Sequence, residues 1–332
     1  MRHYWLSGLL CVVMLFALSA WNQGRAPFNA GDLVAELTDT PTAVRVVRVG
    51  VIPVIDVLPF YVADQQGYFT QQGIQVEFVP AKAAQERDAL MQAGEIDAML
   101  TDLVAVGLFN REQVQLQVVA TARRATVGSP MFRVLAAPGA EIKIVKDVAG
   151  VPVGISRNTI IQYVTERLLV AEGLTPEQIK TTEVSAIPVR FEQLINGQLK
   201  VATLPDPLGQ GALAAGASLL VDDSRYTQYA QTVLCFSRGA VESWPDTIKG
   251  FLTAWDLAVR DLNDHPDQFA DLLIEKGRVP DSIKGTYRMP VFASGEVPRQ
   301  AEWQDVMDWM VEKGLLEQSL VYTDSVLSNF VE

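Results

Sequence analysis

Two aspartates, Asp102 and Asp206, directly follow short apolar runs and are the first candidates for chemistry. Thr101 precedes the first and Pro205 precedes the second. A carboxylate at such a position accepts hydrogen bonds from amino or ring N–H groups of a ligand and repels a sulfonate. The alternative is that each carboxylate caps the loop or helix that follows it. The sequence leaves both interpretations open.

The tetrapeptide Ser156–Thr159 offers a different chemistry just before a helical pattern. It supplies the hydroxyls of Ser156 and Thr159, the guanidinium of Arg157 and the amide of Asn158. A helix N-terminus favours a negative group by about 0.3–1 kcal/mol when exposed. Arg157 would therefore pair with an acidic group of a ligand, unless it is a solvated loop residue. Asn158 and Thr159 would serve equally well as helix caps.

A second loop follows the first apolar run of the chain and ends in a proline-marked helix. It contributes four further candidates for contact with a ligand, namely Pro53, Val54, Ile55 and Asp56. Phe60 comes next and would stack on a flat ring of the ligand. The competing interpretation is that Phe60 packs between its helix and the sheet.

Catalytic and metal-binding side chains are scarce in the 332 residues. Histidine occurs only at His3 and His265, and cysteine only at Cys11 and Cys235. This set gives poor support for a zinc site or a catalytic Cys–His arrangement, so we expect no catalytic residue, metal or cofactor. The formal charge of −12 argues against a nucleic-acid partner, because phosphates require a basic face.

Strands and helices alternate along the chain, which predicts an α/β fold with parallel sheets covered on both faces. The first half has predicted strands at Val46–Ile52, Ile74–Pro80, Ala98–Leu100 and Leu116–Ala122. Predicted helices separate them, beginning near Pro59, at Ala83–Ala93 and at Leu103–Phe109. Ligands of open α/β sheets bind beyond the carboxyl ends of the strands, which is where the candidate residues stand.

The same order returns about 104 residues later. The second half has predicted strands at Val151–Ile155, Thr181–Ser185 and Val201–Leu204, with helices at Thr159–Ala171 and Pro188–Ile195. Three landmarks keep an offset of 103 or 104, namely Gly50 with Gly154, Gly94 with Gly197, and Asp102 with Asp206. We interpret this spacing as a duplication that gives two doubly wound α/β lobes facing one cleft. Chance similarity between two α/β stretches is the alternative.

Two segments are predicted to cross between the lobes, at residues 122–138 and 219–237, and two crossings indicate a hinge. Amphipathic helices at Asp246–Asn263, Pro266–Lys276 and Glu302–Lys313 follow and are expected to complete the first lobe. The predicted boundaries are 44–124 and 225–332 for lobe 1 and 125–224 for lobe 2.

The first 20 residues have a basic start, an apolar stretch and small residues at the end, which is typical of a signal peptide. Residues 21–43 are expected to form a linker. We therefore predict an exported protein, periplasmic or associated with the cell surface. Trp21 stands where a lipidated cysteine would be, which argues against lipid anchoring. An uncleaved anchor is the alternative.

Several short motifs occur in a characteristic order between about Val44 and Phe330. They are Val49-Gly50-Val51, Pro59-Phe60-Tyr61-Val62-Ala63, Gly67-Tyr68-Phe69, Gly94-Glu95-Ile96-Asp97-Ala98, Asp147-Val148-Ala149-Gly150, Gly154-Ile155-Ser156 and Leu204-Pro205-Asp206-Pro207-Leu208. In their order and spacing the chain resembles the solute-binding proteins of ABC importers. The resemblance is to the group of aliphatic-sulfonate, taurine, nitrate and thiamine-pyrimidine-synthase-like binders. It implies a type 2 periplasmic-binding fold, with two α/β lobes joined by two hinge crossings.

The resemblance also implies partners and a function. The expected partners are a small-molecule ligand and an ABC permease and ATPase complex at the membrane, and the protein is expected to be a monomer. The expected ligand is a small organic nutrient, heteroaromatic and thiamine-pyrimidine-like or sulfonate-like. The alternative is an exported enzyme of the same fold, of the thiamine-pyrimidine or menaquinone-precursor type. The thiamine-pyrimidine enzyme uses a histidine and a cysteine-rich motif that His265 and Cys235 alone cannot supply.

Overall fold

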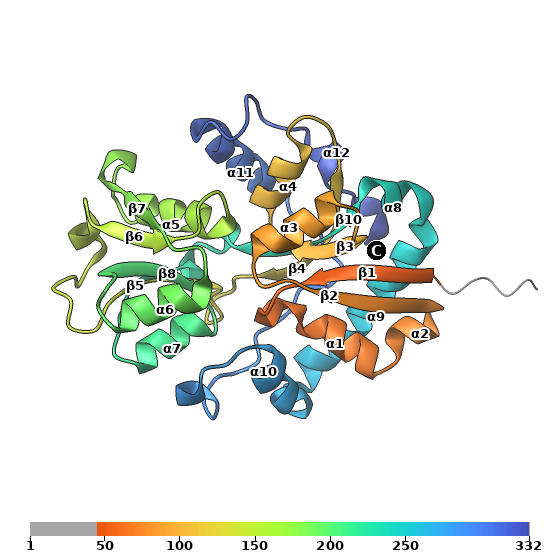
Figure 1. Cartoon of the computed structure of the whole chain (residues 1–332), viewed down its shortest axis with the longest axis horizontal. Coiled ribbons are helices and arrows are strands. Elements are labelled where there is room, and N and C mark those ends of the chain that lie inside the picture. The colour runs from red at the N-terminus through yellow and green to blue at the C-terminus, as the bar shows by residue number, and fades with distance from the viewer. Residues whose placement is uncertain (1–44, 332) are drawn as a thin grey trace, which may run out of the picture. The chain divides into compact units, whose positions relative to one another are not determined.

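The structure is a computed structural model that describes residues 45–331. The predicted signal peptide and linker, with His3, Cys11 and Trp21, lie outside the described residues. Within 45–331 the strands form two five-stranded sheets, of order β2-β1-β3-β10-β4 and β7-β6-β8-β5-β9 (Figure 1). The predicted α/β class with two sheets is therefore confirmed.

The first sheet is built from strands of both ends of the described chain. Its members are β1 (Arg45–Val51), β2 (Ile74–Pro80), β3 (Ala98–Thr101), β4 (Leu116–Arg124) and β10 (Gln231–Ser237). Strands β1, β2 and β3 run parallel, whereas β10 is antiparallel to both β3 and β4. All four residues of β3 are buried, as expected for a parallel strand that is covered on both faces.

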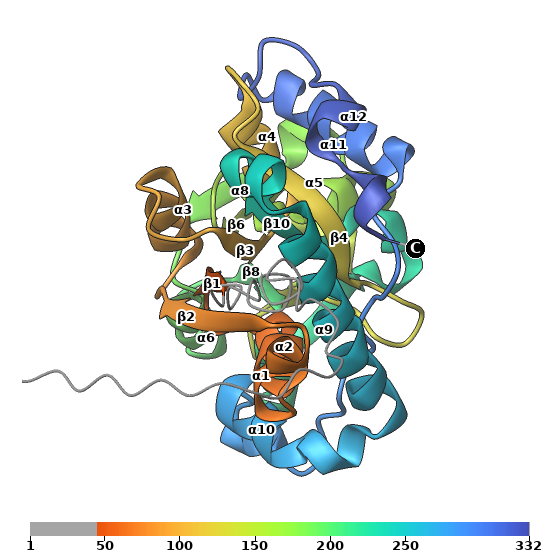
Figure 2. The ribbon, with the colours of Figure 1, turned by 90° about the vertical axis from the view of Figure 1, so that its right-hand side faces the viewer.

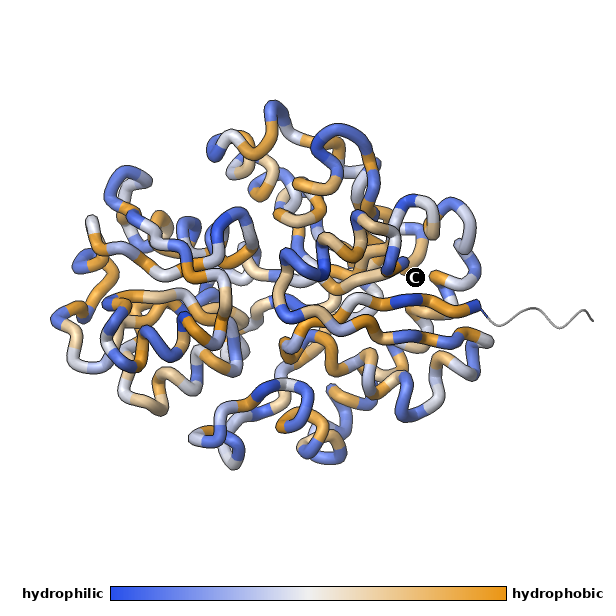
Figure 3. Tube along the Cα trace, viewed as in Figure 1, coloured by the Kyte–Doolittle hydropathy of each residue, from blue (hydrophilic) through white to orange (hydrophobic). Residues whose placement is uncertain are grey.

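The second sheet has the same plan. It contains β5 (Phe132–Ala136), β6 (Pro152–Ile155), β7 (Lys180–Glu183), β8 (Val201–Pro205) and β9 (Ser218–Asp222). Strands β6, β7 and β8 are parallel, and β5 runs antiparallel between β8 and β9. Figure 3 shows hydrophobic segments concentrated along the strands of both sheets and hydrophilic segments in the outer turns.

The helices of the first half lie between its strands. They are η1 (Ile55–Val57), α1 (Leu58–Gln65), α2 (Tyr68–Gln71), α3 (Ala84–Gln92) and α4 (Leu103–Asn110). Pro59 occupies the first turn of α1, where its missing N–H has no helical partner. Gly67 adopts a φ of +71°, so the chain ends one helix there and begins the short helix α2, which the sequence did not predict.

The second half carries similar helices between its strands, and η2 precedes β6. They are η2 (Val145–Val148), α5 (Ile160–Ala171), η3 (Pro176–Gln178), α6 (Ile187–Ile195) and α7 (Leu208–Ala214). Both ends of α6 follow both ends of α3 by 103 residues, which is the offset of the predicted duplication. Together with the matching sheet orders, this register confirms the predicted repeat.

Equivalent glycines occupy equivalent surroundings in the two halves. A Cβ atom on Gly50 would lie 2.5 Å from Ile96 Cδ1 and 3.2 Å from Arg87 Cγ, and one on Gly154 would lie 2.6 Å from Leu199 Cδ1 and 3.4 Å from Arg190 Cδ. Arg87 and Arg190 are also 103 residues apart and occupy the same turn of α3 and α6. Each glycine thus leaves room for an apolar side chain, Ile96 or Leu199, and lies beside an arginine stem.

Two segments, residues 125–131 and 223–230, connect the sheets. They lie between β4 and β5 and between β9 and β10, and the second contains η4 (Asp223–Arg225) and η5 (Thr227–Tyr229). The Ala125 N–H donates to the Ala230 carbonyl at 3.0 Å, which joins the two segments. Asp223 accepts the backbone N–H groups of Met131 and Phe132 at 2.9 and 3.0 Å. The two predicted crossings are therefore present.

The C-terminal helices mostly cover the first sheet. They are α8 (Arg238–Ser243), α9 (Pro245–Asp264), η6 (Pro266–Phe269), α10 (Ala270–Lys276), η7 (Asp281–Ile283), α11 (Gln300–Glu312), α12 (Tyr322–Ser325) and η8 (Ser328–Phe330). Helix α9 packs on α1, α2 and β2, where Phe60, Phe251 and Trp255 form an aromatic core (Figure 2). Helix α11 packs on α4. Among residues 45–331, no helix has the length and apolar character needed to cross a membrane.

Candidate ligand-binding site

The end of β3 shows how the first sheet uses its candidate residues. Asp102 is buried and caps α4 by accepting the Ala105 N–H at 3.0 Å. Burial raises the pKa of the Asp102 carboxyl. The hydroxyl of Thr101, itself 2% exposed, accepts a hydrogen bond from Arg87 at 2.8 Å. The capping interpretation therefore describes Asp102, and an arginine that the sequence analysis did not select fixes Thr101.

The end of β6, in the second sheet, is also held by an arginine and a helix cap. Ser156 Oγ accepts a hydrogen bond from Arg190 Nη1 at 2.9 Å and donates to the Ser185 carbonyl at 3.1 Å. Thr159 caps α5, accepting the Ile161 N–H at 3.1 Å and donating to the Ser156 carbonyl at 2.8 Å. Ser156 is 5% exposed, and its hydrogen bond with the buried Arg190 holds this turn in place.

Arg157 and Asn158 form the exposed tip of that loop. The Arg157 N–H donates to Glu183 at 2.8 Å, and its side chain is 61% exposed and 3.9 Å from the same carboxylate. Asn158 has a φ of +54°, and its N–H donates to the Gln162 side chain at 2.8 Å. The solvated interpretation therefore fits Arg157 in this conformation.

Asp56 forms a buried ion pair with Arg123 of β4. Arg123 Nη1 lies 2.9 Å from Asp56 Oδ1, and the two side chains are 3% and 9% exposed. The Thr232 hydroxyl donates to the other oxygen of Asp56 at 3.2 Å. The carboxylate that the sequence placed at the loop end is thus neutralised by a strand arginine 67 positions away.

Asp206 is paired in the same way with Arg133 of β5, and both side chains are at most 10% exposed. Burial lowers the pKa of the Arg133 guanidinium, while nearby acids oppose that change. Burial also raises the pKa of the Tyr287 hydroxyl, against the lowering effect of Arg123 and Arg133. The two arginines are thus electrostatic neighbours of one tyrosine, although they belong to different sheets.

The two strand arginines were not predicted from the sequence, although a signal for them existed. Arg123 and Arg133 lie in strands that are otherwise almost entirely buried. A charged residue in such a strand requires a partner, because an isolated buried charge is costly. The partner itself is not readable from local sequence.

The other predicted site residues differ in their exposure to solvent. Pro53 is exposed, Val54 and Pro205 are half-buried, and Ile55 is 1% exposed. The expected contact of Phe60 with a ligand is corrected by the structure. Its ring is 1% exposed and packs edge-on against Trp255 at a centroid distance of 4.9 Å. The whole side chain is therefore buried in the core and presents no surface to a ligand.

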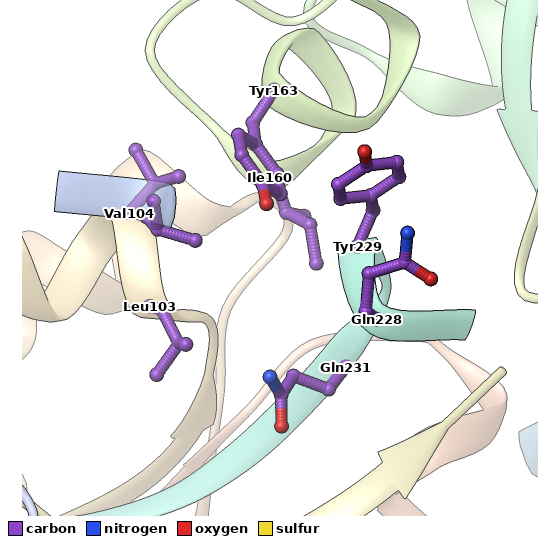
Figure 4. Close-up of a pocket in the computed structure, with 8 residues that line it drawn as sticks. Leu103, Val104, Ile160, Tyr163, Gln228, Tyr229 and Gln231 are labelled. Atoms are coloured by element: carbon purple, nitrogen blue, oxygen red, sulfur yellow. The ribbon is translucent and has the colours of Figure 1, made fainter. Parts of the chain in front are cut away.

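A small hollow lies between the first turns of α4 and α5. Leu103 and Val104 line one side, Ile160 and Tyr163 a second, and residues of the crossing back to the first sheet a third (Gln228, Tyr229, Gln231), with Val306 of α11 (Figure 4). Its volume of about 10 Å³ holds roughly one water molecule. Both helix starts therefore meet at one place, and no organic ligand fits there without separation of the walls.

Within residues 45–331, no group of three or more histidine, cysteine, aspartate or glutamate side chains is placed to hold a metal ion. The cysteine of this part of the chain, Cys235, is unpaired and buried in β10. Burial raises the pKa of its thiol well above the usual range. Its thiolate is thereby disfavoured at neutral pH, unlike that of a reactive cysteine.

Two duplicated α/β halves, two crossing segments and opposed loop ends define the class of periplasmic-binding folds. Among solved structures, the aliphatic sulphonate binding protein SsuA of Escherichia coli matches with a TM-score of 0.71 and 18% identity over 85% of this chain and 92% of its own. The chain belongs to the NMT1/THI5-like family, whose model matches residues 54–269. The resemblance inferred from the sequence is confirmed.

Two further structures show the range of proteins with this fold. The alkanesulfonate-binding protein SsuA of Xanthomonas axonopodis pv. citri, bound to MOPS, has a TM-score of 0.69 and 17% identity over 85% of this chain and 98% of its own. The desulfurization enzyme DSZB has a TM-score of 0.61 and 14% identity over 86% and 97%. No curated protein matches the chain by sequence. The fold therefore includes both binding proteins and an enzyme.

Proposed function

We propose that this protein is the extracytoplasmic substrate-binding component of an ABC importer and captures a small organic nutrient between its two α/β halves. The observation that carries the proposal is the hollow between α4 and α5, whose walls come from both halves and from a crossing segment. A site with such walls opens and closes when the halves move about the crossings. The SsuA structures, which are binding proteins of the same fold, support this role.

The ligand class is the finer part of the proposal. Asp102 and Asp206 had favoured an amine-bearing or heteroaromatic ligand, because free carboxylates repel a sulfonate. Asp206 is found in an ion pair with Arg133, and Asp102 caps α4 with a carboxyl pKa that burial raises, which removes much of that repulsion. Sulfonate-like ligands and thiamine-pyrimidine-like heteroaromatics are therefore both retained as candidates, and the names of the SsuA neighbours support the former.

The remaining parts of the proposal concern organisation and partners. We assign lobe 1 to residues 44–124 and 225–332 and lobe 2 to 125–224, with an N-terminal signal peptide and export to the periplasm or cell surface. A permease and an ATPase would receive the ligand, and the binding protein would act as a monomer. The predicted loop-end residues, with Phe60 removed, form the proposed ligand contacts.

The enzyme alternative has less support. DSZB shares the fold, and its structures include a cysteine-to-serine variant in complex with biphenyl-2-sulfinic acid. In this chain Cys235 is fully buried in a strand with a raised thiol pKa, so it is poorly suited to act as a nucleophile. The three predicted site carboxylates, Asp56, Asp206 and Asp102, are held in ion pairs or a helix cap.

Scanning calorimetry against riboflavin, pyrimidines, taurine, alkanesulfonates and nitrate tests the proposal. A ligand at 100 times its Kd adds about 2.7 kcal/mol to the free energy of unfolding, which raises the Tm by several degrees. Gln228→Trp, at an exposed position on the rim of the hollow, should abolish the shift. The matched Gln198→Trp, exposed elsewhere, should retain it. If no compound of the panel shifts the Tm, the proposal fails.

A further inference from the structure

Arg190 of α6 is a fully buried cation with no acidic partner. Its Nε donates to the Thr203 carbonyl at 2.8 Å, and its Nη1 donates to Ser156 Oγ at 2.9 Å and to the Val184 carbonyl at 2.6 Å. Its Nη2 is buried and has no hydrogen-bond partner within residues 45–331. No carboxylate of that range lies within 4.0 Å of the guanidinium, so all its contacts are with uncharged oxygens.

Arg87, the duplicate of Arg190 in α3, shows what is missing. It makes the equivalent bond to the Leu100 carbonyl at 2.9 Å, but its guanidinium also binds Asp88 at 2.6 Å. The position that corresponds to Asp88 in the second half, 103 residues later, is Phe191. The second half therefore has the buried cation without the carboxylate that balances it in the first half.

An unbalanced buried charge is costly, because desolvation is not repaid by an opposite charge. Burial accordingly lowers the pKa of Arg190 to about 10. The charge of Glu183 opposes this change, but Glu183 is 39% exposed and accepts the Arg157 N–H. Glu183 would also weaken the binding of an anion beside it. Its exposure to solvent limits that effect.

The position of Arg190 indicates where a counter-charge would come from. Its partners Val184 and Ser156 directly follow the carboxyl ends of β7 and β6, where ligands of open α/β sheets bind, and its third partner, Thr203, lies in the middle of β8. The 12-residue helix α5 begins at Ile160, four residues after Ser156, and its N-terminus favours negative charge. A buried unpaired donor and a helix start thus coincide at one strand end.

We propose that Arg190, with Ser156 and the start of α5, forms a subsite that takes the anionic oxygen group of the ligand, a sulfonate, carboxylate or phosphate. This inference rests on the proposed function and narrows its ligand class to anions. The first half contributes no such subsite, because Asp88 already neutralises Arg87. The ligand would therefore bind in one orientation, with its charged end at the second sheet.

Substitution of Phe191 tests this subsite without removing the arginine. Phe191→Asp restores the carboxylate that Arg87 possesses and should neutralise Arg190 internally. The affinity for anionic probes, measured by titration calorimetry with ethanesulfonate, benzoate and phenyl phosphate, should fall by about tenfold or more. Phe191→Asn has nearly the same shape without the charge and is the matched control. Equal affinities of the two variants would overturn the subsite.

Variants of the arginines provide the second measurement. Arg190→Met should lower the affinity for the same anions by about tenfold or more, and Arg190→Lys should retain part of it. Arg87→Met should leave the affinity within about threefold of the unmodified protein. If Arg87→Met and Arg190→Met lower affinity equally, both arginines only support their loops and the inference fails.

The two levels of the proposal fail separately. If riboflavin or an uncharged pyrimidine binds while the three anions do not, the protein is a binding protein but the Arg190 subsite is wrong. If neither class of probe binds, the proposed function fails and the inference fails with it. Among the anions, the tightest probe distinguishes sulfonate, carboxylate and phosphate as the source of charge.

Discussion

Arg123 and Asp56 bury opposite charges 2.9 Å apart where the first sheet meets its loop. Arg133 and Asp206 do the same in the second sheet. A buried ion pair contributes little net stability when intact, but loss of one partner leaves an isolated charge in a medium of low polarity. Replacement of one member of a pair should therefore reduce the free energy of unfolding more than replacement of both members.

Arg123→Met should reduce the free energy of unfolding by about 3–5 kcal/mol, because Asp56 is then left without a counter-charge. The double variant Asp56→Asn with Arg123→Met should recover a large part of that loss. Urea denaturation followed by circular dichroism measures both. A double variant that is as unstable as Arg123→Met alone would show that packing, and not charge, explains the loss.

Asp223 predicts a pH dependence of stability. Burial raises the pKa of its carboxyl in the folded protein to about 7, against about 4 in an unfolded chain. Between these values the folded state holds a proton that the unfolded state has lost. The contribution of Asp223 is therefore most favourable at low pH, and it declines by up to about 1.4 kcal/mol per unit as pH rises toward 7.

The contribution of Asp223 to stability is measured by denaturing the unmodified protein and Asp223→Asn at pH 5 and at pH 7.5. The difference in unfolding free energy between the two proteins is then compared at the two pH values. The variant should be less stable at both pH values, because an amide cannot accept from both Met131 and Phe132. Its deficit should be smaller at pH 7.5. A deficit that grows with pH would contradict the raised pKa.

At the scale of elements, α11 is attached to both halves of the molecule. It packs on α4 of the first half, and its polar face binds α5 of the second. Asp305 accepts hydrogen bonds from the Tyr163 hydroxyl at 2.5 Å and from Arg167 Nε at 2.9 Å. Trp309 Nε1 donates to Glu166 at 2.9 Å. These bonds hold the closed wall of the hollow.

Asp305→Ala should weaken that wall, because it leaves the buried Tyr163 hydroxyl without its acceptor and Arg167 without its carboxylate. We expect faster hydrogen exchange in α5 and α11 and a change in ligand affinity of several-fold, with the exchange of β1 and β2 unchanged. Asp308→Ala, on an exposed face of the same helix, is the control. Identical exchange in both variants would exclude a role for the α5–α11 contact in closure.

Most elements were predictable because their apolar periods and glycine stops are local. Strand β2 has the predicted bounds, and the predicted helix at Ala83–Ala93 became α3 at Ala84–Gln92. The helix after Pro59 was less well predicted, since α2 resumes directly after Gly67. The segment from Pro266 also divides into a 3-10 turn and α10. Short helices at glycines and prolines depend on packing, which periodicity does not contain.

The location of the candidate residues at strand ends was predictable, and their contacts were much less so; their role in binding a ligand stays a prediction. The predicted strand ends led to the selection of Thr101, Asp102, Ser156 and Asp206, because loops that bind ligands follow parallel strands. The arginines that contact these residues were not predicted. Each lies in a strand or helix that only the folded structure brings next to its partner. Phe60 was placed wrongly because its neighbours Phe251 and Trp255 lie nearly 200 residues away.

At the scale of the whole described chain, the two crossing segments are the connections that any opening must bend. Asp223 ties the start of β5 to the second crossing, and the Ala125–Ala230 bond ties both crossings together. Small-angle scattering should therefore show a smaller radius of gyration when a ligand is added to the free protein, if the free form is open. An unchanged radius would place the free protein in the closed form already.

The hollow between α4 and α5 has a kinetic consequence. Because it holds about one water molecule, a closed molecule cannot admit a nutrient, and separation of the walls must precede association. The observed rate of ligand association should therefore rise with concentration and then level off at the rate of opening. Stopped-flow mixing on Trp309 fluorescence would measure that plateau. The plateau would set the fastest turnover at which a transporter supplied by this protein could work.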